Sequence, residues 1–341
     1  MNILYVGNHL SKAKTGADQV NMRNQTVLEK LGKVTYIHLS HNILSRINFS
    51  VSNSVLKRIY QELSISEYNY IFIQQSLLGR VCSSIKRKYP TIPIILFFHN
   101  IERKYAREYL KIAGIKAFPF YWFVRYWEKK AIKNSDIYIT LNKRDSELLY
   151  DYYKVRSNLI LPTSFRDVYC SHLLPAKECV EIIDYLFVGV AFFANIEGIQ
   201  WFITHVFPYV KGNLYIIGNN MDKIKFSGVN DRIHVLGFVD NLTSFYERAR
   251  FIVLPIFSGA GMKTKTAEAL MYGKNIIGTK EAFEGYEIDE RCMIECNNAQ
   301  EFISAINDHS NLPLYNLNSR ELFLKNYTYE SSLQQLKTII K

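Results

Sequence analysis

The sequence contains few cysteines and no long apolar run. Its five cysteines are too few and too scattered for a disulfide scaffold, so we expect reduced thiols. No stretch reaches the roughly 18 apolar residues that a transmembrane helix needs. Residues 1–7 predict a buried strand and lack a basic leader, so we expect no cleaved signal peptide. These absences favour a globular protein of the reduced cytoplasm.

Metal-binding patterns are also missing. Cys292 and Cys296 have the spacing CxxxC, but no second pair of Cys or His lies near them in the sequence. No Asp-x-Asp motif occurs. There is no internal repeat and no recognisable nucleic-acid-binding module. We therefore expect no metal, no cofactor and no nucleic-acid partner.

Charge is shared unevenly between the two halves of the chain. The 341 residues are 48% apolar and 21% charged, which suits a globular protein with two cores. Residues 1–180 hold 27 Lys and Arg against 13 Asp and Glu, whereas residues 181–341 hold 15 against 18. The basic half predicts an anionic partner. A phosphate-bearing acceptor, an anionic lipid and a nucleic acid all carry the required charge.

Short apolar runs alternate with helical patterns along most of the chain. We predict strands at 2–7, 33–39, 70–74, 94–99 and 137–141, and then at 185–190, 214–218, 233–236, 251–257, 275–279 and 293–295. Helices are predicted between most of them, including 19–31, 120–134, 197–207, 241–248 and 264–271. The alternation restarts after a turn-rich segment near 165–182, which predicts a linker. The pattern indicates two doubly wound α/β domains, with ligands at the carboxyl ends of the strands.

The most informative segment follows the apolar run 251–257. Two glycines, Gly259 and Gly261, lead into a predicted helix that starts near Lys263 and Lys265 and contains Glu268. The unpaired N–H groups and the dipole of a helix N-terminus attract anions. Lysines in the first turn oppose the dipole, so helix stability does not explain the pair, whereas a bound phosphate does.

An ordinary tight turn explains the glycines equally well, and a glutamate in a helix is commonly exposed to solvent. The coincidence of glycines, lysines and glutamate favours phosphate binding. Apolar neighbours on both sides of Glu268 predict that its carboxylate is buried, and a buried carboxylate needs partners. A ligand that offers sugar hydroxyls is one such partner.

The segment 258–279 resembles the donor-binding signature of retaining glycosyltransferases of family 4, which have the GT-B fold. The segments 184–202 and 233–239 are similar to the start of that family's C-terminal domain and to its base-contacting strand and loop. Residues 1–7 with Gly16, and 97–100 with His99, resemble its first glycine loop and the strand end that places a histidine at the sugar. The resemblance is strongest over 184–285.

The resemblance implies a two-domain enzyme that uses a nucleotide-sugar. It implies Rossmann-like domains at 1–168 for the acceptor and 182–320 for the donor, facing a cleft, with a C-terminal helix at 321–341 packing back on the first domain. Donor-binding residues would be Gly16, Val239, Gly259, Ala260, Gly261, Met262, Lys263, Lys265 and Glu268. His99, Lys263 and Glu268 would be catalytic. Without the resemblance, Gly16 is an ordinary loop glycine, Asp18 a helix cap and His99 a structural residue.

The implied reaction moves a sugar, with retention, to a glycan or lipid-linked hydroxyl in bacterial capsule, exopolysaccharide or O-antigen synthesis. The implied location is cytoplasmic and peripheral on the inner face of the cell membrane. No metal is required, because lysines can neutralise the diphosphate. Ala260 replaces a glutamate common in the family, and Val190–Phe192 replace a usual Arg or Lys. These departures leave open a catalytically silent subunit with the same fold that binds a partner.

One further segment, 117–130, is unusually rich in aromatic residues, and basic residues interleave with them. Such a segment can contact a membrane surface or a lipid-linked acceptor. A core helix with basic residues along its wet side gives the same pattern, and both interpretations stay open.

Overall fold

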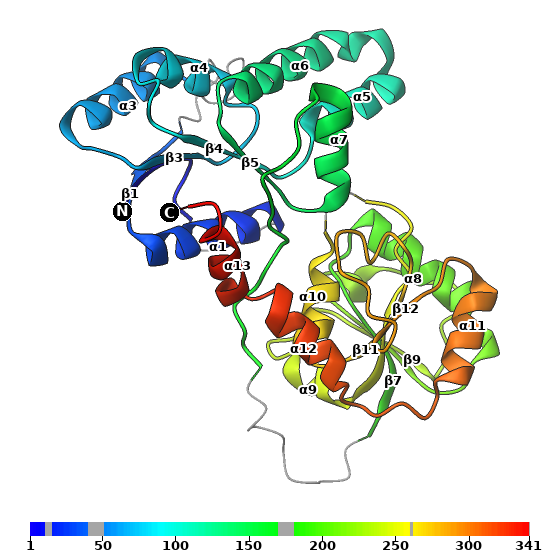
Figure 1. The fold of residues 1–341 in the computed structure, drawn as a ribbon. Helices are drawn as coiled ribbons and strands as arrows, with labels where there is room; N and C mark the ends of the chain where they lie inside the picture. Colours follow the sequence, from blue (N-terminus) through cyan, green and yellow to red (C-terminus); the bar gives the residue numbers. More distant parts are fainter. Residues whose placement is uncertain (11–15, 40–50, 170–180, 260–261, 341) are drawn as a thin grey trace. The chain divides into compact units, whose positions relative to one another are not determined.

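The computed structural model of the chain describes residues 1–10, 16–39, 51–169, 181–259 and 262–340. Two compact units make up the chain: Met1–Thr163 with Tyr329–Lys341, and Ser164–Thr328. In the described residues each unit contains a six-stranded, all-parallel sheet flanked by helices (Figure 1). The predicted pair of doubly wound α/β domains is therefore confirmed.

The sheet of the first unit has the order β2-β1-β3-β4-β5-β6. Its strands are β1 (Asn2–Val6), β2 (Lys33–Ile37), β3 (Tyr70–Ile73), β4 (Ile94–Phe98), β5 (Ile137–Thr140) and β6 (Leu159–Ile160). Its helices are α1 (Gly16–Leu31), α3 (Asn53–Ile65), α4 (Gly79–Lys88), α5 (Glu102–Ala113), the 3-10 turn η1 (Gly114–Ala117), α6 (Phe118–Lys133), α7 (Lys143–Tyr153) and α13 (Tyr329–Leu336).

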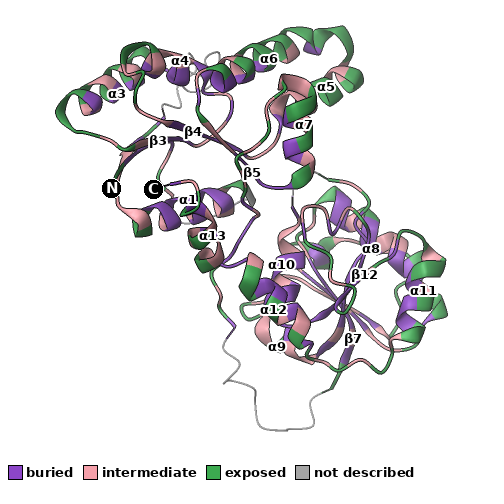
Figure 2. Ribbon diagram, viewed as in Figure 1, coloured by how far each residue is buried: buried purple, intermediate pink, exposed green. Residues whose placement is uncertain are grey.

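Alternate residues of these strands enter two separate cores. Ile3, Tyr5 and Phe72 pack with α1 and α13, whereas Leu4 and Ile71 pack with α3, α4, α6 and α7 on the opposite face. This is the two-residue period of a strand whose two faces are both covered by helices. Figure 2 shows the buried strands between partly exposed helices.

The sheet of the second unit has the order β12-β11-β10-β7-β8-β9. Its strands are β7 (Ile183–Val188), β8 (Leu214–Ile217), β9 (Ile233–Leu236), β10 (Ala249–Leu254), β11 (Asn275–Gly278) and β12 (Met293–Glu295). Its helices are α8 (Phe193–His205), α9 (Thr243–Arg248), α10 (Thr264–Met271), α11 (Ala299–Asp308) and α12 (Leu317–Asn326), with short 3-10 turns η3 (Phe207–Tyr209) and η4 (Met221–Lys223). The predicted limits of β9, β12 and α10 are those observed.

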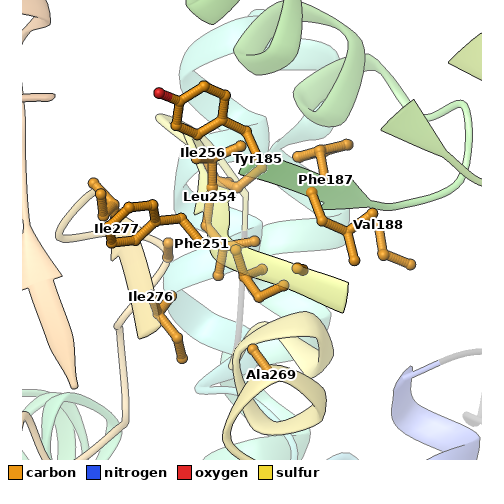
Figure 3. Packing of buried hydrophobic residues seen from close by; sticks show 14 of the residues in the cluster. Tyr185, Phe187, Val188, Phe251, Leu254, Ile256, Ala269, Ile276 and Ile277 are labelled. Atoms are coloured by element: carbon orange, nitrogen blue, oxygen red, sulfur yellow. The ribbon is translucent and has the colours of Figure 1, made fainter. Parts of the chain in front are cut away.

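Apolar side chains of the central strands fill one continuous core in this unit. Tyr185 and Phe251, on the adjacent strands β7 and β10, stack with ring centroids 6.5 Å apart. Ala269 of α10 belongs to the same cluster as Ile276 of β11 (Figure 3). This packing holds α10 against the sheet.

Two differences between the predicted and the observed elements are instructive. The strand predicted at 251–257 ends at Leu254, because Pro255 has no N–H with which to continue the ladder. The C-terminal helix predicted at 321–341 is not continuous: α12 ends at Asn326 and α13 begins at Tyr329, with Tyr327 and Thr328 between them. Helix α12 packs on α10 in the second unit, and α13 packs on α1 in the first.

Helix α13 is held to α1 by polar contacts. The buried Arg23 guanidinium donates to the Ser332 hydroxyl at 3.0 Å and to the Pro162 carbonyl at 2.8 Å. Lys30 forms a salt bridge with Glu330 at 3.0 Å.

Over the described residues, no helix is long and apolar enough to span a bilayer.

Candidate functional site

The candidate site lies at the carboxyl ends of β7 and β10. These strands are neighbours in the sheet, yet the next strand after β7 lies on one side and the next after β10 on the other. The connections therefore leave in opposite directions, and such a switch point is where open α/β sheets bind ligands. Helices α8 and α10 both begin at this edge.

A glycine contact sets the position of α8. A Cβ built on Gly198 would lie 1.9 Å from the Pro255 carbonyl oxygen, so only glycine fits where this helix meets the segment after β10. Gly189, which follows β7, makes a less severe contact, because such a Cβ would lie 3.0 Å from the Asn195 side-chain amide. The two glycines allow the loop after β7 and the start of α8 to pack closely beside the end of β10.

Lys265, in the first turn of α10, reaches across to α8. Its Nζ donates to the Oδ1 of Asn195 at 2.7 Å, and the Nδ2 of Asn195 donates to the Val190 carbonyl at 2.8 Å. Burial lowers the pKa of Lys265 to about 8, against an opposing effect of the Glu268 carboxylate. The lysine is thus a partly desolvated cation whose hydrogen-bond partner is a neutral amide.

Glu268 lies one turn further along α10. Its Oε2 accepts a 3.4 Å hydrogen bond from the Tyr246 hydroxyl, and burial raises the pKa of its carboxyl while Lys265 opposes that rise. The Tyr246 ring stacks on Tyr272 with centroids 4.5 Å apart. The carboxylate therefore has partners within the chain, and its burial alone does not require a ligand.

Lys263 immediately precedes α10. Its Nζ forms a salt bridge with the Glu281 carboxylate at 2.7 Å, and its side chain is 10% exposed. The Lys263 carbonyl accepts a 2.6 Å hydrogen bond from the Tyr286 hydroxyl, while Thr266 donates to the Ala282 carbonyl at 2.7 Å. The loop after β11 therefore fixes the start of α10 and places a carboxylate beside its first lysine.

This arrangement can bind an anion. Helix α10 presents its N-terminal amides at the switch point, and Lys265 adds a desolvated positive charge there. The Glu281 carboxylate competes with any anion for Lys263. The described residues contain no cluster of His, Cys, Asp or Glu that could hold a metal ion.

The remaining predicted site residues are distributed over both units. Met262 is 9% exposed, and Gly259 has φ +133°, in the region that glycine tolerates. Ala260 and Gly261 lie outside the described residues. Val239 follows β9 and packs against the core of the second unit.

Gly16 and His99 belong to the first unit, where Gly16 begins α1 and His99 follows β4. The Nε2 of His99 is 2.9 Å from the Oδ1 of Asn21. Burial lowers the pKa of His99 to about 4, so the ring is neutral near pH 7. Their roles toward a ligand stay predictions.

Two residues that the sequence interpretation did not select belong to the site. Asn195 is 7% exposed and connects Lys265 to the loop after β7. Glu281 pairs with Lys263. Asn195 follows the carboxyl end of β7, and Glu281 follows that of β11. Ligands bind at the carboxyl ends of strands in such sheets, so this position is the sequence signal that could have identified both residues.

One region of the chain matches a known protein family. Residues 183–311 match the family model described as Glycosyl transferases group 1. The chain is a glycosyltransferase. The matched region includes the whole switch point of the second unit, from β7 to α11. The chain has no significant sequence match among curated proteins.

Solved structures show that this glycosyltransferase has the GT-B fold. HepE from Anabaena, in complex with UDP, superposes with a TM-score of 0.63 at 12% identity, over 99% of each chain. A glycosyltransferase from Rickettsia africae gives 0.65 at 12% identity, over 100% of this chain and 97% of that one. The lipopolysaccharide outer core galactosyltransferase WaaB gives 0.66 at 11% identity, over 100% and 99%.

Proposed function

We propose that the enzyme transfers a sugar from a nucleotide-diphosphate-sugar to a glycan or lipid-linked hydroxyl, with retention at the anomeric carbon. The observation that carries the proposal is the N-terminus of α10 at the switch point, next to the desolvated Lys265. A diphosphate is the anion that suits this site. Assignment to the retaining family 4 is part of the proposal and rests on the resemblance of segment 258–279.

UDP is the first nucleotide to test. Structures of the neighbour HepE contain UDP, UDP with glucose, and UDP-glucose. The second unit has the fold that these neighbours share, and Val239 is proposed to lie near the base. GDP- and dTDP-sugars are the alternatives with the same diphosphate leaving group, and CMP-sugars, which release a monophosphate, are the contrasting case.

The proposed chemistry concentrates on the leaving group. As the bond from the sugar C1 to the phosphate oxygen breaks, negative charge develops on the diphosphate. Backbone amides of Gly261–Lys263 and the side chains of Lys263 and Lys265 stabilise that charge. The amino groups perform the neutralisation, so we propose that no metal is required. Glu268 accepts hydrogen bonds from the ribose hydroxyls. The Tyr246 hydroxyl, which donates to the Glu268 Oε2 at 3.4 Å, loses that hydrogen bond when the ribose binds.

The acceptor hydroxyl attacks C1 from the face that the diphosphate leaves, and its proton passes to the leaving phosphate oxygen. His99 takes no proton in this scheme, because its low pKa keeps the ring neutral. It positions the transferred sugar by hydrogen bonding, and Gly16 allows close approach of the backbone. We place the reaction in assembly of bacterial surface polysaccharide, at the cytoplasmic face of the membrane.

A thermal-shift screen across nucleotide-sugars, followed by a donor-hydrolysis assay, tests the proposal. A ligand at a hundred times its dissociation constant stabilises the folded state by about 2.7 kcal/mol. We expect one nucleotide family to raise the Tm of the wild-type protein and to leave the Tm of Lys265→Met unchanged. The absence of any shift with all four families would refute the donor site.

A catalytically silent subunit is the second candidate. Val190 and Phe192 are exposed in the loop after β7, where the resembled family has an Arg or Lys. Lys263 already forms a salt bridge with Glu281 and is therefore not free to bind a diphosphate without breaking it. These features fit a surface that binds a partner protein. Hydrolysis of a bound donor would exclude this candidate, whereas nucleotide binding without hydrolysis or transfer would favour it.

A further inference from the structure

The helical hairpin of α5, η1 and α6 in the first unit is unusually exposed. Among the 23 residues from Tyr105 to Trp127, only Ala106, Ala117 and Val124 are buried. Figure 2 shows this hairpin as largely exposed. A helical pair of this kind normally buries an apolar stripe against the core.

The exposed residues are strongly apolar. Ile112 and Ile115 are 86% and 87% exposed at the turn between the helices, and Phe118 is 53% exposed beside them. The other exposed aromatic residues of the hairpin are Tyr105, Tyr109, Phe120, Trp122, Phe123 and Tyr126. A contiguous exposed apolar surface of this kind marks an interaction site.

The same hairpin is basic. From Glu102 to Lys133 there are nine Lys or Arg and three Asp or Glu, and one of the acids, Glu128, is fully buried. A groove of about 530 Å³ on α6 is lined by Trp122, Arg125, Tyr126, Lys129, Lys130 and Lys133. A second groove of about 860 Å³ is lined in part by Lys57, Arg80, Arg87 and Lys130, and no Asp or Glu lines it. The two grooves share Lys130.

The hairpin is firmly attached to the unit. The buried carboxylate of Glu128 accepts hydrogen bonds from the first two amides of α5, Glu102 N at 2.9 Å and Arg103 N at 3.1 Å. It also accepts from Ser76 at 2.9 Å and from Tyr153 at 2.6 Å. Gly79 lets α4 approach α6, because a Cβ there would lie 2.2 Å from the Trp127 carbonyl oxygen. The exposed surface is thus held in place by a satisfied buried carboxylate.

We propose that this hairpin docks the enzyme on an anionic lipid bilayer. Ile112, Ile115 and Phe118 enter the boundary of the acyl chains, Trp122 and Tyr126 lie at headgroup level, and the lysines contact lipid phosphates. Charge selects this partner over a second copy of the chain, because pairing two such hairpins would bring like charges together. The inference does not depend on the donor site, since lipid binding requires no nucleotide.

Co-sedimentation of the full chain with vesicles tests the inference. We expect the wild-type protein to bind phosphatidylcholine vesicles that contain phosphatidylglycerol, and to lose that binding in pure phosphatidylcholine or in high salt. Lys129→Glu with Lys133→Glu should weaken binding at least about tenfold. Ile115→Ser with Phe118→Ser should weaken it by a similar factor while leaving the Tm unchanged.

Matched variants elsewhere serve as controls. Lys225→Glu with Lys337→Glu reverses two exposed charges outside the hairpin, and Tyr209→Ser with Ile288→Ser removes two exposed apolar side chains of the second unit. Neither pair should change vesicle binding. Equal losses in the hairpin and control variants would overturn the proposal, as would binding indifferent to anionic lipid. Self-association that Ile115→Ser with Phe118→Ser abolishes, without vesicle binding, would assign the surface to a second copy instead.

Discussion

The two units share an all-parallel sheet but place different chemistry at its carboxyl edge. In the first unit, neutral amides hold the described start of the loop after β1: Gln74 accepts from the Asn8 amide at 3.0 Å, and Gln25 donates to the Asn8 carbonyl at 2.7 Å. In the second unit the corresponding edge holds charged groups, Lys263 with Glu281 and Lys265 near Glu268. The described part of the loop after β1 thus relies on neutral amides, whereas the start of α10 in the second unit carries ionisable groups.

The difference assigns roles to the units under the proposed function. A diphosphate needs positive charge in a partly desolvated place, and the second unit supplies it where Lys265 lies in the first turn of α10. Neutral amides suit hydroxyl groups, as a sugar or an acceptor presents. Part of the excess positive charge of the first unit lies at the α5–α6 hairpin, where residues 102–133 hold nine Lys or Arg against three Asp or Glu.

Lys265→Met removes the charge that most separates the two edges. We expect turnover to fall about a hundredfold, or about 2.7 kcal/mol of barrier, because the leaving diphosphate loses a buried cation. Steady-state kinetics with the donor found by the thermal-shift screen measures the change. Lys280→Met, an exposed lysine after β11, is the matched control and should retain wild-type turnover. Unchanged turnover in Lys265→Met would remove the distinction drawn between the units.

Gly198→Ala tests the close contact that shapes the charged edge. The added Cβ would meet the Pro255 carbonyl at 1.9 Å, so α8 must shift, and we expect a loss of about 2 kcal/mol in the free energy of unfolding. Urea unfolding measures it. Glu197→Ala, an exposed neighbour on the same helix, should change stability by less than about 0.5 kcal/mol. Equal stability of the two variants would show that the helix can relax without cost.

The Lys263–Glu281 pair offers a sharper test of the charged edge. Lys263→Ala should lower turnover about tenfold, because it removes a cation and leaves the Glu281 carboxylate near the leaving diphosphate. Adding Glu281→Ala should restore part of that loss, since the repelling charge is gone. Strictly additive losses in the double variant would mean that Glu281 does not compete with the donor.

Because burial lowers the pKa of Lys265 to about 8, nucleotide affinity and the free energy of unfolding should change in opposite directions as the pH rises. Nucleotide affinity, measured by calorimetry, should fall about tenfold between roughly pH 7 and pH 9, because the free enzyme loses the proton that the diphosphate requires. Stability should rise over the window from about 8 to 10.5, since the unfolded lysine keeps its proton there and the folded one does not. Lys265→Met should lose both effects. An affinity independent of pH in the wild-type protein would contradict this account.

The sequence by itself determined the alternation of strands and helices, the start of α10 and the uneven charge of the two halves. These follow from local properties: apolar runs define buried parallel strands, and Gly273 ends α10 with φ +62°. The limits of β9, β12 and α10 were predictable for that reason. Pro255, which ends β10 early, is also a local signal. It lies inside an apolar run, however, so the sequence predicted that the strand continues to residue 257.

Only the tertiary structure decided the partners of the charged groups. Lys265 meets Asn195, 70 residues earlier in the chain, and Lys263 meets Glu281, 18 residues later. The tertiary structure also divides the C-terminal segment into two helices, which pack on two different cores. It leaves aromatic residues of α6 exposed, whereas the sequence left a core helix and a surface helix both open. The physical reason is that periodicity reports the local backbone, whereas burial and charge pairing depend on which distant segments the fold brings into contact.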